Sequence, residues 1–235
     1  MKPAVTAIGT LLVGALAISG AALVLHSAPV TPPTLVATPS TAPGSLPPGV
    51  TKAVSLNLST YGDSSAIKWR RGNGGQGPHP DWVSYGPTTV LQVPAHALVT
   101  VTITQYDTGD RIPNPFLSEV HGTVGGTAQL TMADGKTSTV TSIDQAHVGH
   151  TFTVRSFPSS AQDTLFVSVP VPAVSSNAPA LANGFPKPNV MTFSFITKGK
   201  GTYAWNCEFP CGSNYASFGG PMATYGYMSG TLKVV

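Results

Sequence analysis

Charge is scarce in this chain. Only 9% of the 235 residues are Asp, Glu, Lys or Arg, and the formal net charge is +3. Nucleic-acid-binding domains usually carry a clustered basic face, whereas the densest basic group here is the short stretch of residues 68–71, Lys-Trp-Arg-Arg. We therefore expect no nucleic-acid partner.

Familiar catalytic motifs are also missing. The sequence contains no Gly-x-Ser-x-Gly nucleophile motif, no phosphate-binding loop and no zinc-protease helix, and its few carboxylates are scattered. Cysteine is limited to Cys207 and Cys211, which permits one disulfide or one metal site and nothing more elaborate. A hydrolytic enzyme is the least favoured class, and we expect a protein that is not an enzyme.

A long apolar run is present only at the N-terminus. Lys2 precedes a charge-free segment, residues 4–25, which at about 1.5 Å per residue can cross a bilayer core of about 30 Å. Cleavable signal peptides usually have a shorter apolar core. We interpret residues 1–26 as a signal anchor, with a cleaved signal peptide as the alternative. Lys2 would then stay inside, and the rest would lie on the extracytoplasmic face of the cell membrane, or be secreted after cleavage.

Residues 27–50 are mostly Pro, Thr, Ser and Ala and carry no charge. Such a composition favours extended polyproline geometry, so we predict a semi-rigid, Pro-rich linker. The remaining residues, 51–235, are predicted to form one domain with an N-terminal elaboration.

That domain has no long stretch of helical periodicity, and its apolar residues alternate in short runs separated by turn residues. This pattern predicts an all-β fold, a two-sheet antiparallel sandwich with its last strand beside the strand that contains Phe193. The predicted strands cover residues 53–59, 88–93, 98–104, 128–132, 138–143, 150–154, 165–169, 191–196 and 231–235.

The chemistry gathers near the C-terminus. Residues 201–212, Gly-Thr-Tyr-Ala-Trp-Asn-Cys-Glu-Phe-Pro-Cys-Gly, hold both cysteines, and Met228 follows downstream. Two soft sulfur ligands on a loop between strands, with a methionine nearby, suit a thiophilic metal such as copper.

This region resembles the closing pattern of the cupredoxins: Gly-Thr-Tyr-x-Trp-x-Cys, a loop, then Met-x-Gly-Thr-Leu-x-Val. The Cys-x-x-x-Cys-Gly form is most similar to the copper domain of cytochrome c oxidase subunit II and of nitrous oxide reductase. The resemblance implies a cupredoxin-like Greek-key β-sandwich. In that family a His follows the second Cys, with a Met three residues later. Here Tyr225 stands in the His position, residues 213–224 are inserted, and no His follows Cys211.

A second stretch, His150-Thr151-Phe152, resembles the His-x-Phe in which cupredoxins place their first copper-binding His. Its other ring nitrogen would need a backbone or carboxylate partner. His147 is the substitute ligand, although we expect an exposed loop residue there. The predicted metal ligands are His150, Cys207, Cys211 and Met228, converging in one pocket that suits a mononuclear copper better than a paired-copper centre.

Alternatives remain open at each of these positions. His150 can be a hydrogen-bonded strand residue, Met228 a core residue, and Cys207 and Cys211 a disulfide or inert core thiols. Two functions follow. The first is a membrane-anchored copper protein that transfers electrons to a redox partner or handles copper for a respiratory chain. The second is a metal-free cupredoxin-like binding or scaffold module with a Cys207–Cys211 disulfide.

Overall fold

The computed structural model describes residues 32–42, 44–63, 66–67, 81–109, 114–158, 161–209, 211 and 220–235. Within them the chain forms strands and short 3-10 turns, and the predicted all-β class is confirmed. Each 3-10 turn has three residues: Phe116–Ser118 (η2), Val124–Gly126 (η3), Gln145–His147 (η4) and Pro221–Ala223 (η5).

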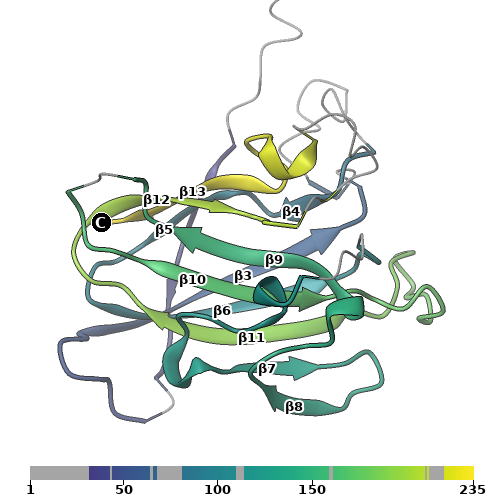
Figure 1. Cartoon of the computed structure of the whole chain (residues 1–235), viewed down its shortest axis with the longest axis horizontal. Helices are drawn as coiled ribbons and strands as arrows, with labels where there is room; N and C mark the ends of the chain where they lie inside the picture. Colours follow the sequence, from purple (N-terminus) through teal and green to yellow (C-terminus); the bar gives the residue numbers. More distant parts are fainter. Residues whose placement is uncertain are drawn as a thin grey trace, which may run out of the picture.

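The described strands form two sheets (Figure 1). The first has the order β1-β5-β13-β12-β9-β10. Its strands are Thr34–Val36 (β1), Val90–Val93 (β5), Ser229–Val234 (β13), Gly201–Asn206 (β12), Val148–Arg155 (β9) and Phe166–Pro172 (β10).

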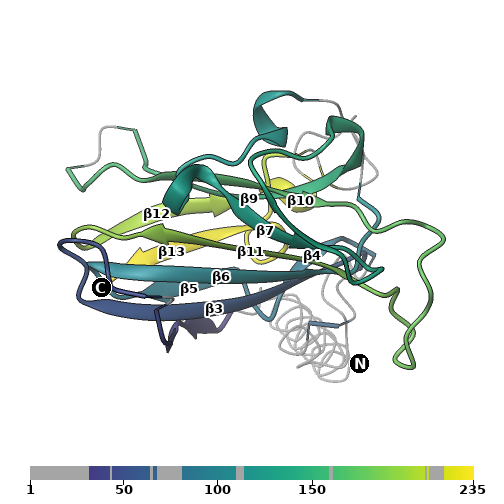
Figure 2. The ribbon, with the colours of Figure 1, turned by 90° about the horizontal axis from the view of Figure 1, so that it is seen from below.

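The second sheet has the order β2-β3-β6-β11-β7-β8, and β4 pairs with β3 beside this path. Seen from below, its strands β3, β6 and β11 lie across β12 and β13 of the first sheet (Figure 2). The strands are Thr38–Pro39 (β2), Lys52–Tyr61 (β3), Ser84–Gly86 (β4), Ala97–Gln105 (β6), Asn189–Ile196 (β11), Ala128–Thr131 (β7) and Thr137–Val140 (β8).

The sandwich is mixed rather than antiparallel, which corrects the sequence prediction. β3 runs parallel to β6, and β5 runs parallel to both β1 and β13. The final strand was also misplaced. β13 pairs with β12 and β5 in the first sheet, whereas Phe193 lies on β11 in the second. Alternation identifies a strand and its buried face, but it carries no information about the neighbouring strand.

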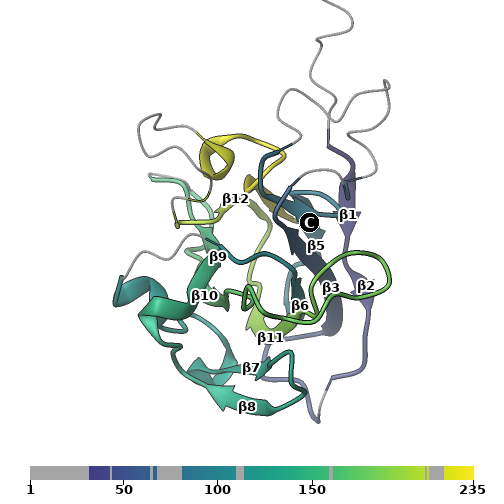
Figure 3. The ribbon, with the colours of Figure 1, turned by 90° about the vertical axis from the view of Figure 1, so that its right-hand side faces the viewer.

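Part of the predicted linker belongs to the sandwich. β1 pairs with β5 of the first sheet, and β2, after one intervening residue, pairs with β3 of the second. Figure 3 shows the two strands following one another along the side of the molecule. The sandwich therefore begins before residue 51, because residues 34–39 satisfy their backbone groups by adding to the edges of both sheets.

Alternation along the strands builds the core between the sheets. On β6 and β11 every second side chain is buried, and the buried faces of the two sheets meet where Phe152 of β9 lies 5.3 Å, ring to ring, from Phe193 of β11. Trp205 of β12 packs at 5.6 Å from the same Phe152 ring. The aromatic rings thus join the sheets through the middle of the sandwich.

Among the residues that the structure describes, no helix combines the length and hydropathy needed to cross a membrane. The predicted membrane segment, residues 4–25, lies outside those residues.

Candidate metal centre

Strand alternation aims His150 and Cys207 at the same end of the core. His150 lies two residues before the buried Phe152 on β9, and Cys207 follows the buried Trp205 by two residues at the end of β12. Side chains two apart on a strand share a face. Because β12 and β9 pair directly, both side chains meet at the end where β12 gives way to the cysteine loop.

The three predicted residues that carry nitrogen or thiol sulfur come together. His150 Nδ1 is 2.9 Å from Cys211 Sγ and 4.0 Å from Cys207 Sγ, and the two sulfurs are 2.9 Å apart. All three residues are buried, and their ligand atoms lie within 4.8 Å of one another. His150, Cys207 and Cys211 therefore form a possible copper site, since a buried imidazole and two thiols are the donors that soft metals prefer.

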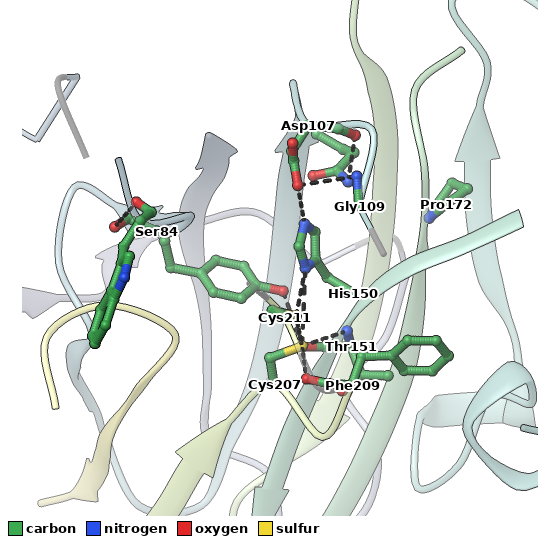
Figure 4. Close-up of polar contacts among 12 residues, drawn as sticks. Ser84, Asp107, Gly109, His150, Thr151, Pro172, Cys207, Phe209 and Cys211 are labelled. Carbon is green, nitrogen blue, oxygen red and sulfur yellow. Dashed lines mark hydrogen bonds and ion pairs between the residues drawn. The ribbon is translucent and has the colours of Figure 1, made fainter. Parts of the chain in front are cut away.

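The far side of the imidazole is occupied by a carboxylate. His150 Nε2 lies 2.8 Å from Asp107 Oδ2, and Figure 4 shows the ring lying between Asp107 and the two cysteines. The prediction that the second ring nitrogen needs a partner is confirmed, and the partner is an aspartate two residues past the end of β6.

Backbone groups surround the sulfur of Cys207. The N–H of Thr151 points to Cys207 Sγ at 3.4 Å, and the Cys207 thiol lies 3.5 Å from the carbonyl of Phe209. The backbone N–H of Cys207 itself donates to the carbonyl of Met228 at 2.8 Å. The start of β13 is thereby fixed beside the first cysteine.

Hydroxyl groups on the other face of β9 hold the cysteine loop in place. Thr151 Oγ1 accepts the backbone N–H of Glu208 at 2.8 Å and the hydroxyl of Thr153 at 3.1 Å. Thr153 Oγ1 is 3.0 Å from Ser168 Oγ. Because a hydroxyl has a single proton, Ser168 donates to Thr153, and the chain of hydroxyls runs from β10 through β9 to the loop.

The buried groups shift one another's pKa. For His150, burial lowers the pKa, but the hydrogen bond to Asp107 and the interaction with Cys207 outweigh it and raise the pKa to about 9. For Cys207, burial raises the pKa, and the hydrogen bonds to Cys211 and His150 lower it to about 5. The thiolate charge belongs to the cysteine pair rather than to one sulfur, because both sulfurs contact the same ring nitrogen. The metal-free centre is therefore an ion pair near neutral pH.

The other predicted or substitute residues lie as follows. Met228 is fully buried in the core cluster, and its main chain touches Cys207 as described; a role for its thioether stays a prediction. Tyr225, in the family's His position, has a residue exposure of 51% and so lies at the surface. His147 is exposed and contacts Asp144 at 3.1 Å, which agrees with the loop position expected for it.

Two features of the centre were missed in the sequence. Asp107 follows the most strand-like run of the chain. A carboxylate just past the end of a strand is the signal that could have identified it. The predicted strands do not include β12, whose alternation of Tyr203 and Trp205 is short and follows a glycine. Strand and loop together place Cys207 at the first position after the sheet.

Comparisons with known proteins give only distant likenesses. No protein-family model matches this chain, and no curated protein matches it. Among solved structures it is similar to auracyanin B, with 12% identity, 85% of this chain and 97% of that chain covered, and a TM-score of 0.33. It is also similar to the copper protein rusticyanin, with 15% identity, coverage of 82% and 86%, and a TM-score of 0.34. The Met148Leu form of rusticyanin gives 13% identity, coverage of 82% and 85%, and a TM-score of 0.34.

Proposed function

We propose that this chain is a cupredoxin-like protein that binds one copper ion through His150, Cys207 and Cys211 and uses it for electron transfer or copper handling. The observation that carries the proposal is the convergence of one imidazole nitrogen and two thiol sulfurs within 4.8 Å in the buried end of a β-sandwich. The proposal rests on these residues of the chain and not on the remote structural likenesses.

The donor set fits copper in its chemistry. Thiolate sulfur selects Cu(I) and other soft ions, and imidazole suits copper in either oxidation state. Met228 is the proposed fourth ligand, since thioethers tune copper redox potential from a weak axial position. Only one imidazole faces the sulfurs among the described residues. Four ligands of this kind favour a mononuclear site over the paired-copper centre of the oxidase subunit II domain.

The protein's own contribution is to hold these donors in a dry setting. Bound copper would supply one-electron redox chemistry. The chain excludes water through burial of all three residues, donates the Thr151 N–H to the Cys207 sulfur, and keeps the thiol pair ionised near neutral pH. Hydrogen bonding at the sulfur is one of the means by which a protein adjusts the potential of a copper–thiolate centre.

The location belongs to the proposal as well. We place the sandwich on the extracytoplasmic face of the cell membrane, attached through residues 1–26, where it would meet a redox partner protein or a respiratory enzyme that needs copper. The long charge-free run after Lys2 supports this location.

One observation favours the second function, a metal-free binding or scaffold module. The Cys207 and Cys211 sulfurs are 2.9 Å apart and are not joined by a disulfide bond. Disulfide bonds measure about 2.05 Å, so oxidation would need only a small approach of the two sulfurs. An exported protein meets conditions that favour this oxidation.

Copper titration separates the two functions. The full-length protein is solubilised in detergent and purified without a reductant or a metal-binding tag. Its free thiols are counted, and it is titrated with Cu(I) against a competing chelator. We expect one copper per chain, and loss of binding in Cys207→Ser and in Cys211→Ser. Tyr225→Phe, at the exposed family position, is the control and should bind as the wild type does. Absence of uptake with two free thiols would contradict the copper site, and absence of both thiols would favour the disulfide form.

A further inference from the structure

We propose that Asp107 is a positioning residue of this centre: it holds a proton on His150 Nε2, so that Nδ1 is the nitrogen offered to the two sulfurs and to a metal between them. The part of this inference that concerns a bound metal rests on the proposed function. The part that concerns the proton on the ring rests on the geometry alone. Asp107 touches neither sulfur in the contacts described, and it acts through the imidazole.

The contact between Asp107 and His150 decides which ring nitrogen carries the proton. An ionised carboxylate accepts hydrogen bonds and donates none. The 2.8 Å contact between Asp107 Oδ2 and His150 Nε2 therefore requires a proton on Nε2 in both the neutral and the cationic ring. When a metal binds, the nitrogen that gives up its proton is Nδ1, which lies 2.9 Å from Cys211 Sγ and 4.0 Å from Cys207 Sγ. His150 is only 1% exposed, so its surroundings prevent the ring from turning to present Nε2 to the sulfurs instead.

The carboxylate of Asp107 is itself fixed. Asp107 Oδ2 also accepts the backbone N–H of Gly109 at 3.0 Å. The Asp107 carbonyl accepts the side-chain amide of Gln105 at 2.9 Å and the backbone N–H of Val174 at 3.0 Å. Hydrogen bonds from β6, from the segment after β10 and from its own turn thus hold both the main chain and the side chain of this aspartate.

The turn that follows Asp107 packs closely against β9. Gly109 has a φ of +63°, and a Cβ atom there would lie 2.3 Å from the Cα of Gly149, the neighbour of His150. Only glycine fits this approach. The turn therefore sits directly on the strand that carries the imidazole. Gly62 packs against the other oxygen of the carboxylate, because a Cβ atom there would lie 2.9 Å from Asp107 Oδ1.

This arrangement matches the general use of carboxylates behind metal-bound histidines. Such partners fix the tautomer and the ring orientation, and their loss typically lowers metal affinity by about 10- to 100-fold. In a centre with one imidazole among its described ligands, no second ring can compensate for a wrongly placed proton.

The test measures the ring without a metal and then with one. The full-length protein with ¹⁵N-labelled histidine, reduced and metal-free, is studied well above pH 9, where most His150 rings are neutral. Two-bond ¹H–¹⁵N correlations then report which nitrogen carries the proton. We expect the Nε2–H form alone in the wild type. In Asp107→Asn, whose amide can donate to Nε2, we expect a substantial Nδ1–H population and about 10- to 100-fold weaker Cu(I) binding.

Asp144→Asn is the matched control, because Asp144 contacts His147 Nδ1 at 3.1 Å on the surface. It should change neither the His150 tautomer nor copper affinity. A wild-type ring with its proton on Nδ1 overturns the proposal even if no variant folds. Unchanged tautomer and affinity in Asp107→Asn overturn it too. If the wild type takes up no copper but Asp107→Asn shifts the tautomer as expected, the positioning role stands and the copper function fails.

Discussion

His147, at the end of η4, and His150, on β9, lie three residues apart, and each has an aspartate within hydrogen-bonding distance. His147 pairs with Asp144 in the adjoining 3-10 turn at 3.1 Å, and its side chain is 64% exposed. His150 pairs at 2.8 Å with Asp107, 43 residues away in sequence, and its side chain is 1% exposed. Both pairs have the same two residue types, so the differences between them come from burial and from the groups on the other ring nitrogen.

The comparison shows that the surroundings of an aspartate–histidine pair determine its chemical properties. In water a carboxylate and an imidazole attract one another weakly, because solvent screens the charges and competes for the hydrogen bond. At the buried pair the second ring nitrogen faces two thiols rather than water, and this ring becomes part of a connected set that ends at the cysteines. The predictions below test the two pairs against each other.

The largest difference is expected on removal of the imidazole. His150→Ala leaves the Asp107 carboxylate and the thiol pair without their shared partner in a buried setting, and breaking a buried ionic pair in this way costs about 3–5 kcal/mol. We expect the free energy of unfolding in urea to fall by that order and Cu(I) binding to be lost. A change of less than about 1 kcal/mol would mean that the centre is wetter than its burial indicates.

The second prediction is a pH dependence that only the buried pair can produce, measured on reduced, metal-free protein. The pKa of Cys207 is depressed from 9.0 to about 5, so its stabilising contribution is absent below pH 5 and grows up to pH 9. The pKa of His150 is raised from 6.5 to about 9, so its contribution is complete below pH 6.5 and is lost by pH 9. From pH 5 to 6.5 only the contribution of the Cys207 thiol changes, and stability rises. From pH 6.5 to 9 the contribution of the thiol grows while that of His150 falls, so the two oppose each other.

The expected rise from pH 5 to 6.5 is at most about 2 kcal/mol, at about 1.4 kcal/mol per pH unit for one proton. Urea midpoints at pH 5, 6.5 and 9 measure it. The pKa of the Asp107 carboxyl is lowered from 3.8, so this group titrates below the range of pH 5 to 6.5. The double variant Cys207→Ser/Cys211→Ser should lose the rise. A fall in stability between pH 5 and 6.5 in the wild type would rule out the thiolate–imidazolium pair.

A smaller effect is expected from the hydroxyl chain behind the cysteine loop. Thr151→Val keeps the side-chain shape but removes the acceptor for the Glu208 N–H, which should cost about 1–2 kcal/mol. The matched control is Thr192→Val, which removes one partner of the 3.3 Å hydroxyl pair with Thr102 in the other sheet. We expect Thr151→Val to weaken Cu(I) binding as well, whereas Thr192→Val should leave it unchanged; equal affinities would show that the loop does not depend on this bond.

Much of this fold was predictable because alternation is a local property. β3, β6 and β11 follow from the alternation of their own residues. The convergence of His150 and Cys207 was expected from the resemblance to the cupredoxins and not from periodicity. Sheet order was not predictable, because the parallel pairing of β13 with β5 joins residues far apart in sequence. The role of Asp107 was not predicted for the same reason. Its contact with His150 depends on a glycine turn packed against another strand, and no local pattern of the sequence encodes that approach.

The smallest effect is expected at the exposed pair, and it decides which histidine belongs to the centre. His147→Ala removes a hydrogen-bond partner of Asp144. The pKa of Asp144 is lowered mainly by the backbone N–H of Ala146 and to a smaller extent by His147. The turn keeps that backbone bond, so we expect the urea midpoint to stay within experimental error of the wild type. Cu(I) affinity should also be unchanged, because the sulfurs contact His150. If His147→Ala weakened copper binding as strongly as His150→Ala, the start of β9 would have to rearrange around the metal, and the ligand assignment would pass to His147.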